Sequence, residues 1–173
     1  MTEIRTAIER ATTYLQAHPD EAEYTDGPAT ATLESGLRVR TTGPGDEAVQ
    51  TDMPSSIGGQ DSAPSPGWLL RAAAASCVAT LIAMRASQLG YVLDGLQVTV
   101  DSVSDDRGIL GLDPSIPAGP LRGRILVSLL SGEADRTVLE DLATWGVDHC
   151  PVVDALRRPV PFEVGTSRSP PGL

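Results

Sequence analysis

The sequence predicts an α+β fold in which antiparallel strands and helices are grouped rather than strictly alternating. The strand patterns fall into two groups, residues 30–53 and 91–130, and a long apolar helical pattern at residues 66–89 separates them. A doubly wound parallel sheet instead needs a helix after almost every strand. With 173 residues, the chain is long enough to form one domain around its own core.

An amphipathic helix is expected at residues 3–17, before the first strand. Its apolar side chains recur at helical spacing and share one stripe: Ile4, Ala7, Ile8, Ala11, Tyr14 and Leu15. Thr2 is a suitable N-cap, and Pro19 ends the helix. We therefore divide the chain into an N-terminal helical addition, residues 1–20, and a single domain, residues 21–173.

Three short strands are expected to follow as an antiparallel meander. Their patterns lie at residues 30–33, 37–41 and 48–53, and turns that contain Gly36 and Gly43 separate them. A loop rich in Ser, Gly and Pro then leads to the long helix.

The residues around position 66 are those that start a helix. Ser65 is a good N-cap, and Pro66 suits the first helical position because its missing N–H costs no hydrogen bond there. Gly90 is expected to end the helix after Leu89.

The surface of this helix is almost entirely apolar. Only Arg71, Arg85 and Gln88 interrupt it, so we expect the helix to be central and nearly enclosed. One small sheet cannot cover so much nonpolar perimeter, which predicts a two-fold dimer with this helix buried at its centre.

The remaining elements are expected in the second half of the chain. In order, they are strands at 91–103 and 122–130 joined by a Gly-, Pro- and Asp-rich connector, an amphipathic helix at 134–145, a short helix at 150–157, a last strand at 161–164 and a frayed tail at 166–173.

The composition excludes several kinds of function. A net charge of −10 argues against binding to nucleic acid or to anionic membranes, since both need a basic surface. All 13 basic residues are arginine. Without lysine, the chain cannot form a Schiff base, a pyridoxal phosphate site or a P-loop.

We expect a cytoplasmic protein. No apolar run reaches the ~20 residues of a membrane-spanning helix, since Arg71 and Arg85 break the longest one. The N-terminus lacks the apolar core of a signal peptide. In the cytoplasm a transient catalytic disulfide is more compatible with the redox conditions than a permanent structural one.

The two cysteines have the layout of a two-cysteine redox centre. Cys77 lies in the middle of the apolar helix, where a thiol taken alone is most often an inert packing residue. Cys150 precedes Pro151, which places its sulfur at a predicted helix N-terminus, where unpaired N–H groups favour a thiolate. By this argument Cys150 ionises more readily, with His149 as a candidate proton acceptor, although Cys150 could equally be only a helix cap.

No motif indicates a metal centre or a serine hydrolase. Two His and two Cys make a formal zinc set, but they lack the CxxC or HxxxH spacing of zinc sites. Ser76 has no G-x-S-x-G context around it.

Two segments resemble signatures of the OsmC/Ohr family, the osmotically inducible and organic hydroperoxide resistance proteins. The first comprises TDMP at residues 51–54, Gly58-Gly59 and PSPGWLL at residues 64–70 with the run that follows to Cys77. The second is CPVVDAL at residues 150–156, a Cys-Pro-Val start to a short helix. The resemblance covers about residues 28–165.

This resemblance implies an intertwined homodimer with antiparallel sheets around long central helices. In peroxidatic members the first cysteine, here Cys77, attacks an organic hydroperoxide, and the second, here Cys150, resolves the sulfenic acid into a disulfide. The family order therefore makes Cys77 the nucleophile. A dithiol reductant, which is a lipoyl protein or a thioredoxin-like protein, reopens the disulfide, and no metal, flavin or haem is required.

The resemblance also implies a catalytic arginine that lowers the pKa of Cys77 from the partner subunit. Arg38 and Arg40 on the second strand are the nearest candidates, and we select Arg38. Family members carry a glutamate that positions this arginine where this chain has Gly67. The alternative function is that of a non-enzymatic member, which binds a small apolar ligand or sulfur species at the dimer interface.

Overall fold

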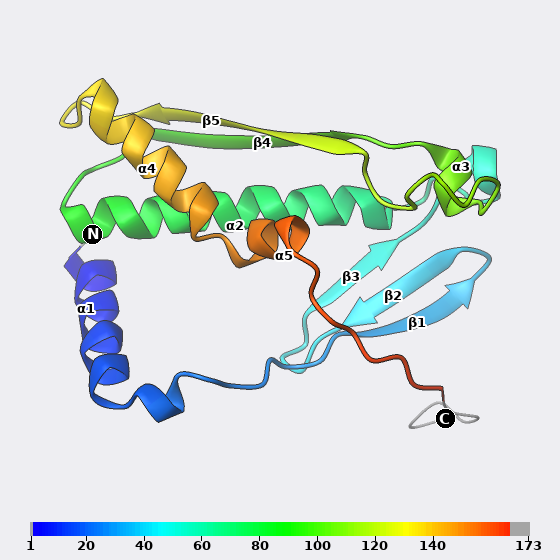
Figure 1. Cartoon of the computed structure of the whole chain (residues 1–173), viewed down its shortest axis with the longest axis horizontal. Coiled ribbons are helices and arrows are strands. Elements are labelled where there is room, and N and C mark those ends of the chain that lie inside the picture. The colour runs from blue at the N-terminus through cyan, green and yellow to red at the C-terminus, as the bar shows by residue number, and fades with distance from the viewer. Residues whose placement is uncertain (1, 167–173) are drawn as a thin grey trace.

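The computed structural model describes residues 2–166, and its organising element is the helix α2 (Pro66–Leu89). The strands β4 (Gly95–Val103) and β5 (Arg122–Leu130) lie along one side of α2, and the helices α4 (Arg136–Asp148) and α5 (Pro151–Arg157) pack against it (Figure 1). The fold is α+β with antiparallel sheets, as the sequence predicts.

The signals at both ends of α2 act as expected. The Ser65 hydroxyl accepts a hydrogen bond from the Trp68 N–H at 3.2 Å, and Pro66 occupies the first turn. Gly90 ends the helix in a left-handed conformation with φ of 88°, which a residue without a Cβ adopts at little cost.

The prediction that α2 is nearly enclosed is wrong for a single subunit. Its buried apolar residues recur every fourth position and form one stripe: Ala74, Val78, Ile82 and Ala86. On other faces of the helix the large side chains of Trp68 and Leu89 remain about half exposed, at 49% and 48%. One subunit covers a single face of α2, because the three-stranded sheet at residues 30–51 does not pack against this helix.

By length and composition alone, α2 is also apolar enough to cross a membrane, contrary to the expectation from the sequence. The central helix of a soluble protein meets the same criterion, so one such helix is weak evidence for a membrane span. The packing of its buried stripe on β4, α4 and α5 gives α2 the role of a core helix.

The strands β4 and β5 form an antiparallel pair whose register runs from Gly95 opposite Leu130 to Val103 opposite Arg122. The alternation along both strands places half of their side chains against α2. These partly buried residues are Leu96, Val98, Val100, Ile125, Val127 and Leu129. The first strand starts at Gly95 rather than at the predicted residue 91, and the connector contains a short unpredicted helix, α3 (Asp106–Ile109).

The meander forms a separate three-stranded antiparallel sheet. Its strands are β1 (Thr30–Ser35), β2 (Arg38–Thr42) and β3 (Ala48–Thr51), in the spatial order β1-β2-β3. This sheet projects away from α2, β4 and β5 (Figure 1). Consequently Leu33 remains 64% exposed although its strand alternates as half-buried strands do.

The predicted strand at residues 161–164 is wrong for this structure. The segment after α5 has no assigned secondary structure, and the side chains of Phe162 and Val164 are 85% and 92% exposed. A strand needs a neighbour for its backbone hydrogen bonds, and none of the described strands pairs with this segment. The predicted tail at 166–173 lies almost wholly outside the described residues.

The N-terminal helix α1 (Thr2–Ala17) is attached to the C-terminal end of α2. Arg5 donates from Nε and Nη2 to the carbonyl oxygen of Gln88, at 3.1 and 2.8 Å. A cation at this end of α2 complements the helix dipole. The helix begins at Thr2 itself, so Thr2 is not its N-cap, and it ends before Pro19, which starts a short 3-10 helix (Pro19–Glu21).

The loop between β3 and α2 is organised around the buried carboxylate of Asp52. This carboxylate accepts hydrogen bonds from the backbone N–H groups of Met53, Gln60 and Ser62 and from the Ser62 hydroxyl, at 2.7–3.1 Å. The pKa of Asp52 is lowered to about 2, and the hydrogen bond from the Ser62 hydroxyl is the largest cause. The loop therefore depends on the ionised form of one side chain.

Asp52→Asn is expected to lower the melting temperature at pH 7, because an amide offers one acceptor oxygen in place of two. The pKa of Asp52 is lower in the folded state, so its contribution is complete above about pH 4 and is lost as the pH falls toward 2. Melting curves measured from pH 7 to pH 2 should therefore converge for the two proteins at the acid end. Asp26→Asn, at an exposed position, is the control and should leave the curves unchanged. Equal melting temperatures for D52N and wild type at pH 7 would contradict the prediction.

Candidate active site

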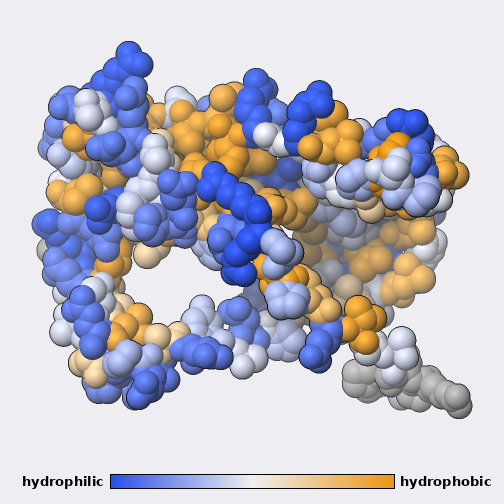
Figure 2. Space-filling view, in the orientation of Figure 1, coloured by the Kyte–Doolittle hydropathy of each residue, from blue (hydrophilic) through white to orange (hydrophobic). Residues whose placement is uncertain are grey.

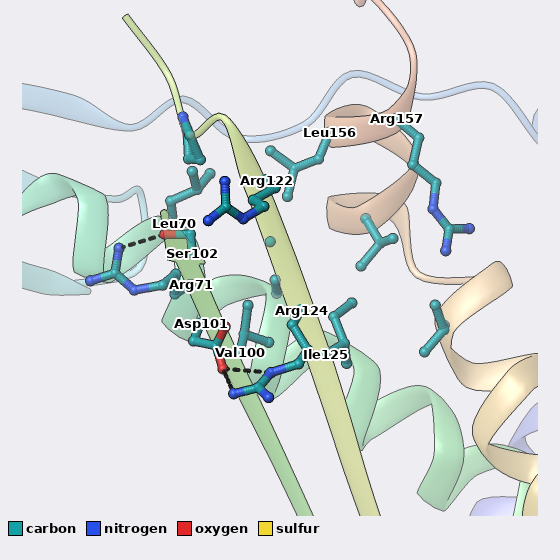
Figure 3. Close-up of a pocket in the computed structure, with 15 residues that line it drawn as sticks. Leu70, Arg71, Val100, Asp101, Ser102, Arg122, Arg124, Ile125, Leu156 and Arg157 are labelled. Carbon is teal, nitrogen blue, oxygen red and sulfur yellow. Dashed lines mark hydrogen bonds and ion pairs between the residues drawn. The ribbon is translucent and has the colours of Figure 1, made fainter. Parts of the chain in front are cut away.

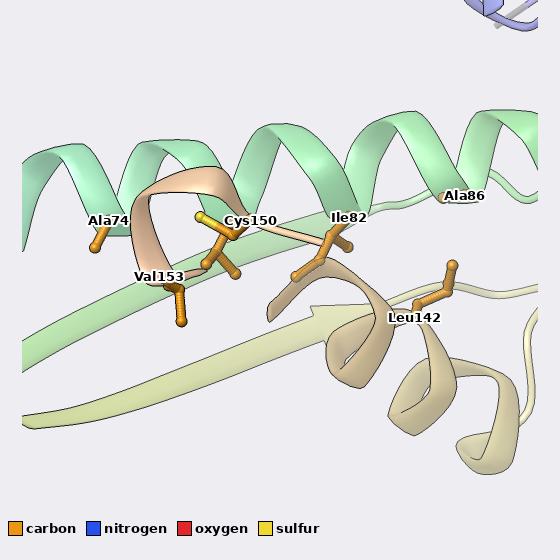
Figure 4. Packing of buried hydrophobic residues seen from close by; sticks show 7 residues of the cluster. Ala74, Ile82, Ala86, Leu142, Cys150 and Val153 are labelled. Atoms are coloured by element: carbon orange, nitrogen blue, oxygen red, sulfur yellow. The ribbon is translucent and has the colours of Figure 1, made fainter. Parts of the chain in front are cut away.

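Cys150 lies at the junction of α4 and α5 and is fully buried. It is the N-cap residue of α5, and its carbonyl oxygen accepts a hydrogen bond from the Asp154 N–H at 2.9 Å. Its side chain makes no capping hydrogen bond, so the hypothesis that the thiol serves only as a helix cap is not supported. In Figure 4 its sulfur points toward α2, in the cluster that contains Ala74 and Val153.

Cys77 lies on α2 one turn after Ala74 and is partly buried against the same cluster. The packing of α5 against α2 places Cys77 close to Cys150, in the same apolar cluster. The two predicted cysteines, which are far apart in the sequence, therefore form one dithiol pair. They are free thiols in this structure.

The environment of Cys77 within one subunit favours the neutral thiol. Burial is the largest cause that raises the pKa of Cys77. The hydrogen bond with Cys150 raises the pKa further, and so does the charge of Cys150 when it is ionised, whereas a hydrogen bond from the Val152 N–H lowers it. Among the described residues, no arginine contributes to the pKa of Cys77.

Arg38 is not part of the dithiol site within one subunit. It lies on β2, in the sheet that does not pack against α2 or α5. Its Nη2 donates to Gln50 Oε1 at 2.8 Å, and its Nε lies 3.3 Å from Glu34 Oε2. Gln50 Nε2 in turn donates to Glu34 at 3.1 Å. The guanidinium is therefore held in place by Glu34 and Gln50, whereas its neighbour Arg40 is exposed.

His149 does not contact either thiol through a described hydrogen bond. Its Nδ1 lies 2.8 Å from the carbonyl oxygen of Trp145, and its ring stacks on the Trp145 ring with 4.1 Å between centroids. The guanidinium of Arg85 lies over the Trp145 ring, 5.0 Å from its centroid. The described residues contain no group of three His, Cys, Asp or Glu side chains that could hold a metal ion.

The sequence did not indicate a cavity that the structure contains beside α2. It has a volume of about 640 Å³ and lies between α2, the β4–β5 pair and α5. Its lining includes four arginines, Arg71, Arg122, Arg124 and Arg157, together with apolar side chains (Figure 3). The one available signal was Arg71, one of two arginines on a largely apolar helix.

The fold, with one long central helix, two antiparallel sheets and a cysteine pair between α2 and α5, defines a class of small α+β thiol proteins. The family model described as OsmC-like protein matches residues 59–165, which is more than half of the chain. The protein belongs to this OsmC-like family. The match begins at Gly59, later than the residue 28 at which the sequence resemblance was expected to begin.

Solved structures support the same fold. An osmotic stress and detoxification response protein of Psychrobacter arcticus is 23% identical, with 77% of this chain and 91% of that chain covered and a TM-score of 0.61. The organic hydroperoxide resistance protein OsmC of Legionella pneumophila is 20% identical, with 79% and 92% covered and a TM-score of 0.58. An OsmC-like protein of Mycoplasma pneumoniae is 13% identical, with 78% and 89% covered and a TM-score of 0.66. No curated protein shows significant similarity to the chain.

Proposed function

We propose that the protein is a thiol-dependent peroxidase that reduces organic hydroperoxides. The observation that carries the proposal is the proximity of Cys77 and Cys150, which lie in one apolar cluster between α2 and α5, since the resolving cysteine must be able to reach the sulfenic acid. Family membership adds support, because a structural neighbour from Legionella pneumophila is named as an organic hydroperoxide resistance protein.

The reaction assigns one role to each cysteine. The thiolate of Cys77 attacks one peroxide oxygen, the O–O bond breaks, and the alcohol leaves after taking up a proton, so that Cys77 becomes a sulfenic acid. Cys150 then attacks the sulfenic sulfur, and water leaves as the disulfide forms. A dithiol reductant, such as a lipoyl protein or a thioredoxin-like protein, supplies two electrons and two protons to restore both thiols.

Burial raises the pKa of Cys77, so a cation placed near its thiol would favour the reactive thiolate. We assign this role to Arg38 of a second copy, because Arg38 is already held in place by Glu34 and Gln50. These two residues would replace the glutamate that family members carry where this chain has Gly67. The assignment favours Cys77 over Cys150 as the nucleophile.

The exposed apolar surface supports a homodimer. The chain leaves large hydrophobic side chains uncovered on α2, on the meander and on the C-terminal segment: Trp68, Leu89, Leu33, Val49, Phe162 and Val164. Orange side chains are visible over these regions in Figure 2. Burying these hydrophobic side chains against a second copy would stabilise the dimer in proportion to the apolar area removed from water.

Sedimentation at micromolar concentration is expected to give twice the chain mass of 18.1 kDa, because a two-fold dimer covers the apolar face of α2. Trp68→Glu, which places a charge on that face, is expected to shift the protein toward monomer. Glu3→Gln, on the exposed α1, is the control and should sediment like the wild type. A monomeric wild type would overturn the dimer and with it the role of Arg38.

Thiol counting with cumene hydroperoxide tests the peroxidase. The reduced protein is expected to lose two thiols per chain, and dithiothreitol should restore them and sustain turnover. If the thiols remain, or oxidise no faster than free cysteine, the peroxidase is excluded. The result would then favour the second candidate, a non-enzymatic protein that binds a small apolar ligand or sulfur species at the dimer interface.

Two further assignments accompany this proposal. We propose that the protein acts in the cytoplasm, where dithiol reductants keep thiols reduced. We also assign residues 1–20 as an addition to a single domain formed by residues 21–173, because the family match begins well after α1.

A further inference from the structure

The cavity between α2, the β4–β5 pair and α5 has an apolar interior. Leu70 and Ala74 of α2, Val100 of β4, Ile125 of β5 and Val153 of α5 line it. Its volume of about 640 Å³ falls within the range of small-molecule binding sites. Ala74 and Val153 also belong to the buried cluster that contains Cys150, but neither cysteine is among the residues that line the cavity.

The same cavity has an unusual charge for this protein. Four of the 13 arginines of a chain with a net charge of −10 line it, and Asp101 is the one acidic residue among the lining residues. Two of these arginines are neutralised: Arg124 contacts Asp101 at 2.6 Å, and Arg157 contacts Asp148 at 3.1 Å. In Figure 3 Arg157 extends away from the other three.

Arg71 and Arg122 are the two cations left for a ligand. Arg71 Nη1 donates to the Ser102 hydroxyl at 3.3 Å, and among the described residues neither arginine forms an ion pair. Arg122 extends from β5 toward Leu70 on α2, the residue that precedes Arg71 (Figure 3). A guanidinium matches a carboxylate through two parallel N–H···O hydrogen bonds.

We propose that this cavity binds an organic carboxylate with an unbranched apolar tail. The carboxylate pairs with Arg122 and Arg71, and the tail lies along Leu70, Val100 and Ile125 toward Ala74 and Val153. A small inorganic anion would leave the apolar walls unused, and a neutral hydrocarbon would leave both guanidinium groups without a partner. The proposal does not depend on the peroxidase, because it concerns binding and involves no thiol chemistry.

Decanoate is the probe, titrated into the full-length reduced protein by isothermal titration calorimetry at low ionic strength. Saturable binding of one decanoate per chain is expected, at least about tenfold weaker in Arg122→Gln and in Arg71→Gln, since each loses a charge-assisted hydrogen bond. Arg10→Gln removes the same charge from the exposed α1 and should bind as the wild type does. Binding should also weaken as salt is added, because Arg122 is exposed.

Ligands that lack either the carboxylate or the long tail test the two parts of the proposal separately. Decanol and acetate should each bind at least about tenfold more weakly than decanoate, because each lacks one part of the recognition. Equal binding of decanol, unchanged affinity in both cavity variants, or no binding of decanoate would overturn the proposal. Cys77→Ser should bind decanoate normally, so a failure of the peroxidase leaves this result standing, and circular dichroism of each variant checks its folding.

Discussion

Cys77→Ser is expected to abolish the consumption of organic hydroperoxide, because serine at this position is not ionised and cannot attack the peroxide oxygen. The residual rate should equal that of the protein-free reaction, whereas the wild type turns over with a dithiol reductant. Ser76→Ala is a matched control on the same helix, and its hydroxyl contacts only the Ala73 carbonyl, at 3.1 Å. Ser76→Ala should keep the wild-type rate.

Cys150→Ser is expected to behave differently. It should reduce one equivalent of hydroperoxide and then stop, with Cys77 left as a sulfenic acid that oxidises further to sulfinic acid in excess peroxide. Mass spectrometry of both variants after one equivalent reads out the two roles. A sulfenic acid on Cys150 in the Cys77→Ser protein would reverse the assignment, and no adduct on either variant would remove the peroxidase.

Gly146→Ala is expected to cause a large loss of stability. Gly146 lies where α4 crosses α2, and a Cβ added there would be 2.3 Å from Ile82 Cγ1 and 3.2 Å from the Ile82 backbone nitrogen. Because Ile82 is fully buried in the central stripe, it has little space to move. We expect a loss of about 1–3 kcal/mol, the usual cost of overpacking a core.

Gly67→Ala is the control that separates packing from helix propensity. Gly67 is also in a helix, but an added Cβ would meet no atom nearer than 3.9 Å. Alanine at either position gains up to about 1 kcal/mol of helix propensity, so G67A should be neutral or stabilising while G146A is destabilised. Thermal unfolding of both decides the point, and an equally stable G146A would show that α4 can move away from α2.

Local signals in the sequence were sufficient for the elements that position the cysteines. Ser65, Pro66 and Gly90 each act within one helical turn, and α2 begins and ends where they predict. β5 also has its predicted bounds, Arg122–Leu130. The family resemblance predicted that Cys77 and Cys150 share one site, and the structure places them close together between α2 and α5.

The failures concern features that depend on distant parts of the chain or on a partner. The segment at 161–164 alternates as a strand does, but no described strand pairs with it. The cavity was missed because Arg71, Arg122 and Arg157 come from three separate elements, and no periodicity links them.

A disulfide between Cys77 and Cys150 would also change the stability of the fold. A covalent bond at this point would close a loop that contains β4, β5 and α4, which together make up much of the core. Closing a loop of this length removes conformational freedom from the unfolded chain and stabilises the folded one by up to about 4 kcal/mol. The oxidised protein would therefore resist heat and proteolysis better than the reduced one, and the same bond that ends a catalytic cycle would protect the fold during peroxide stress.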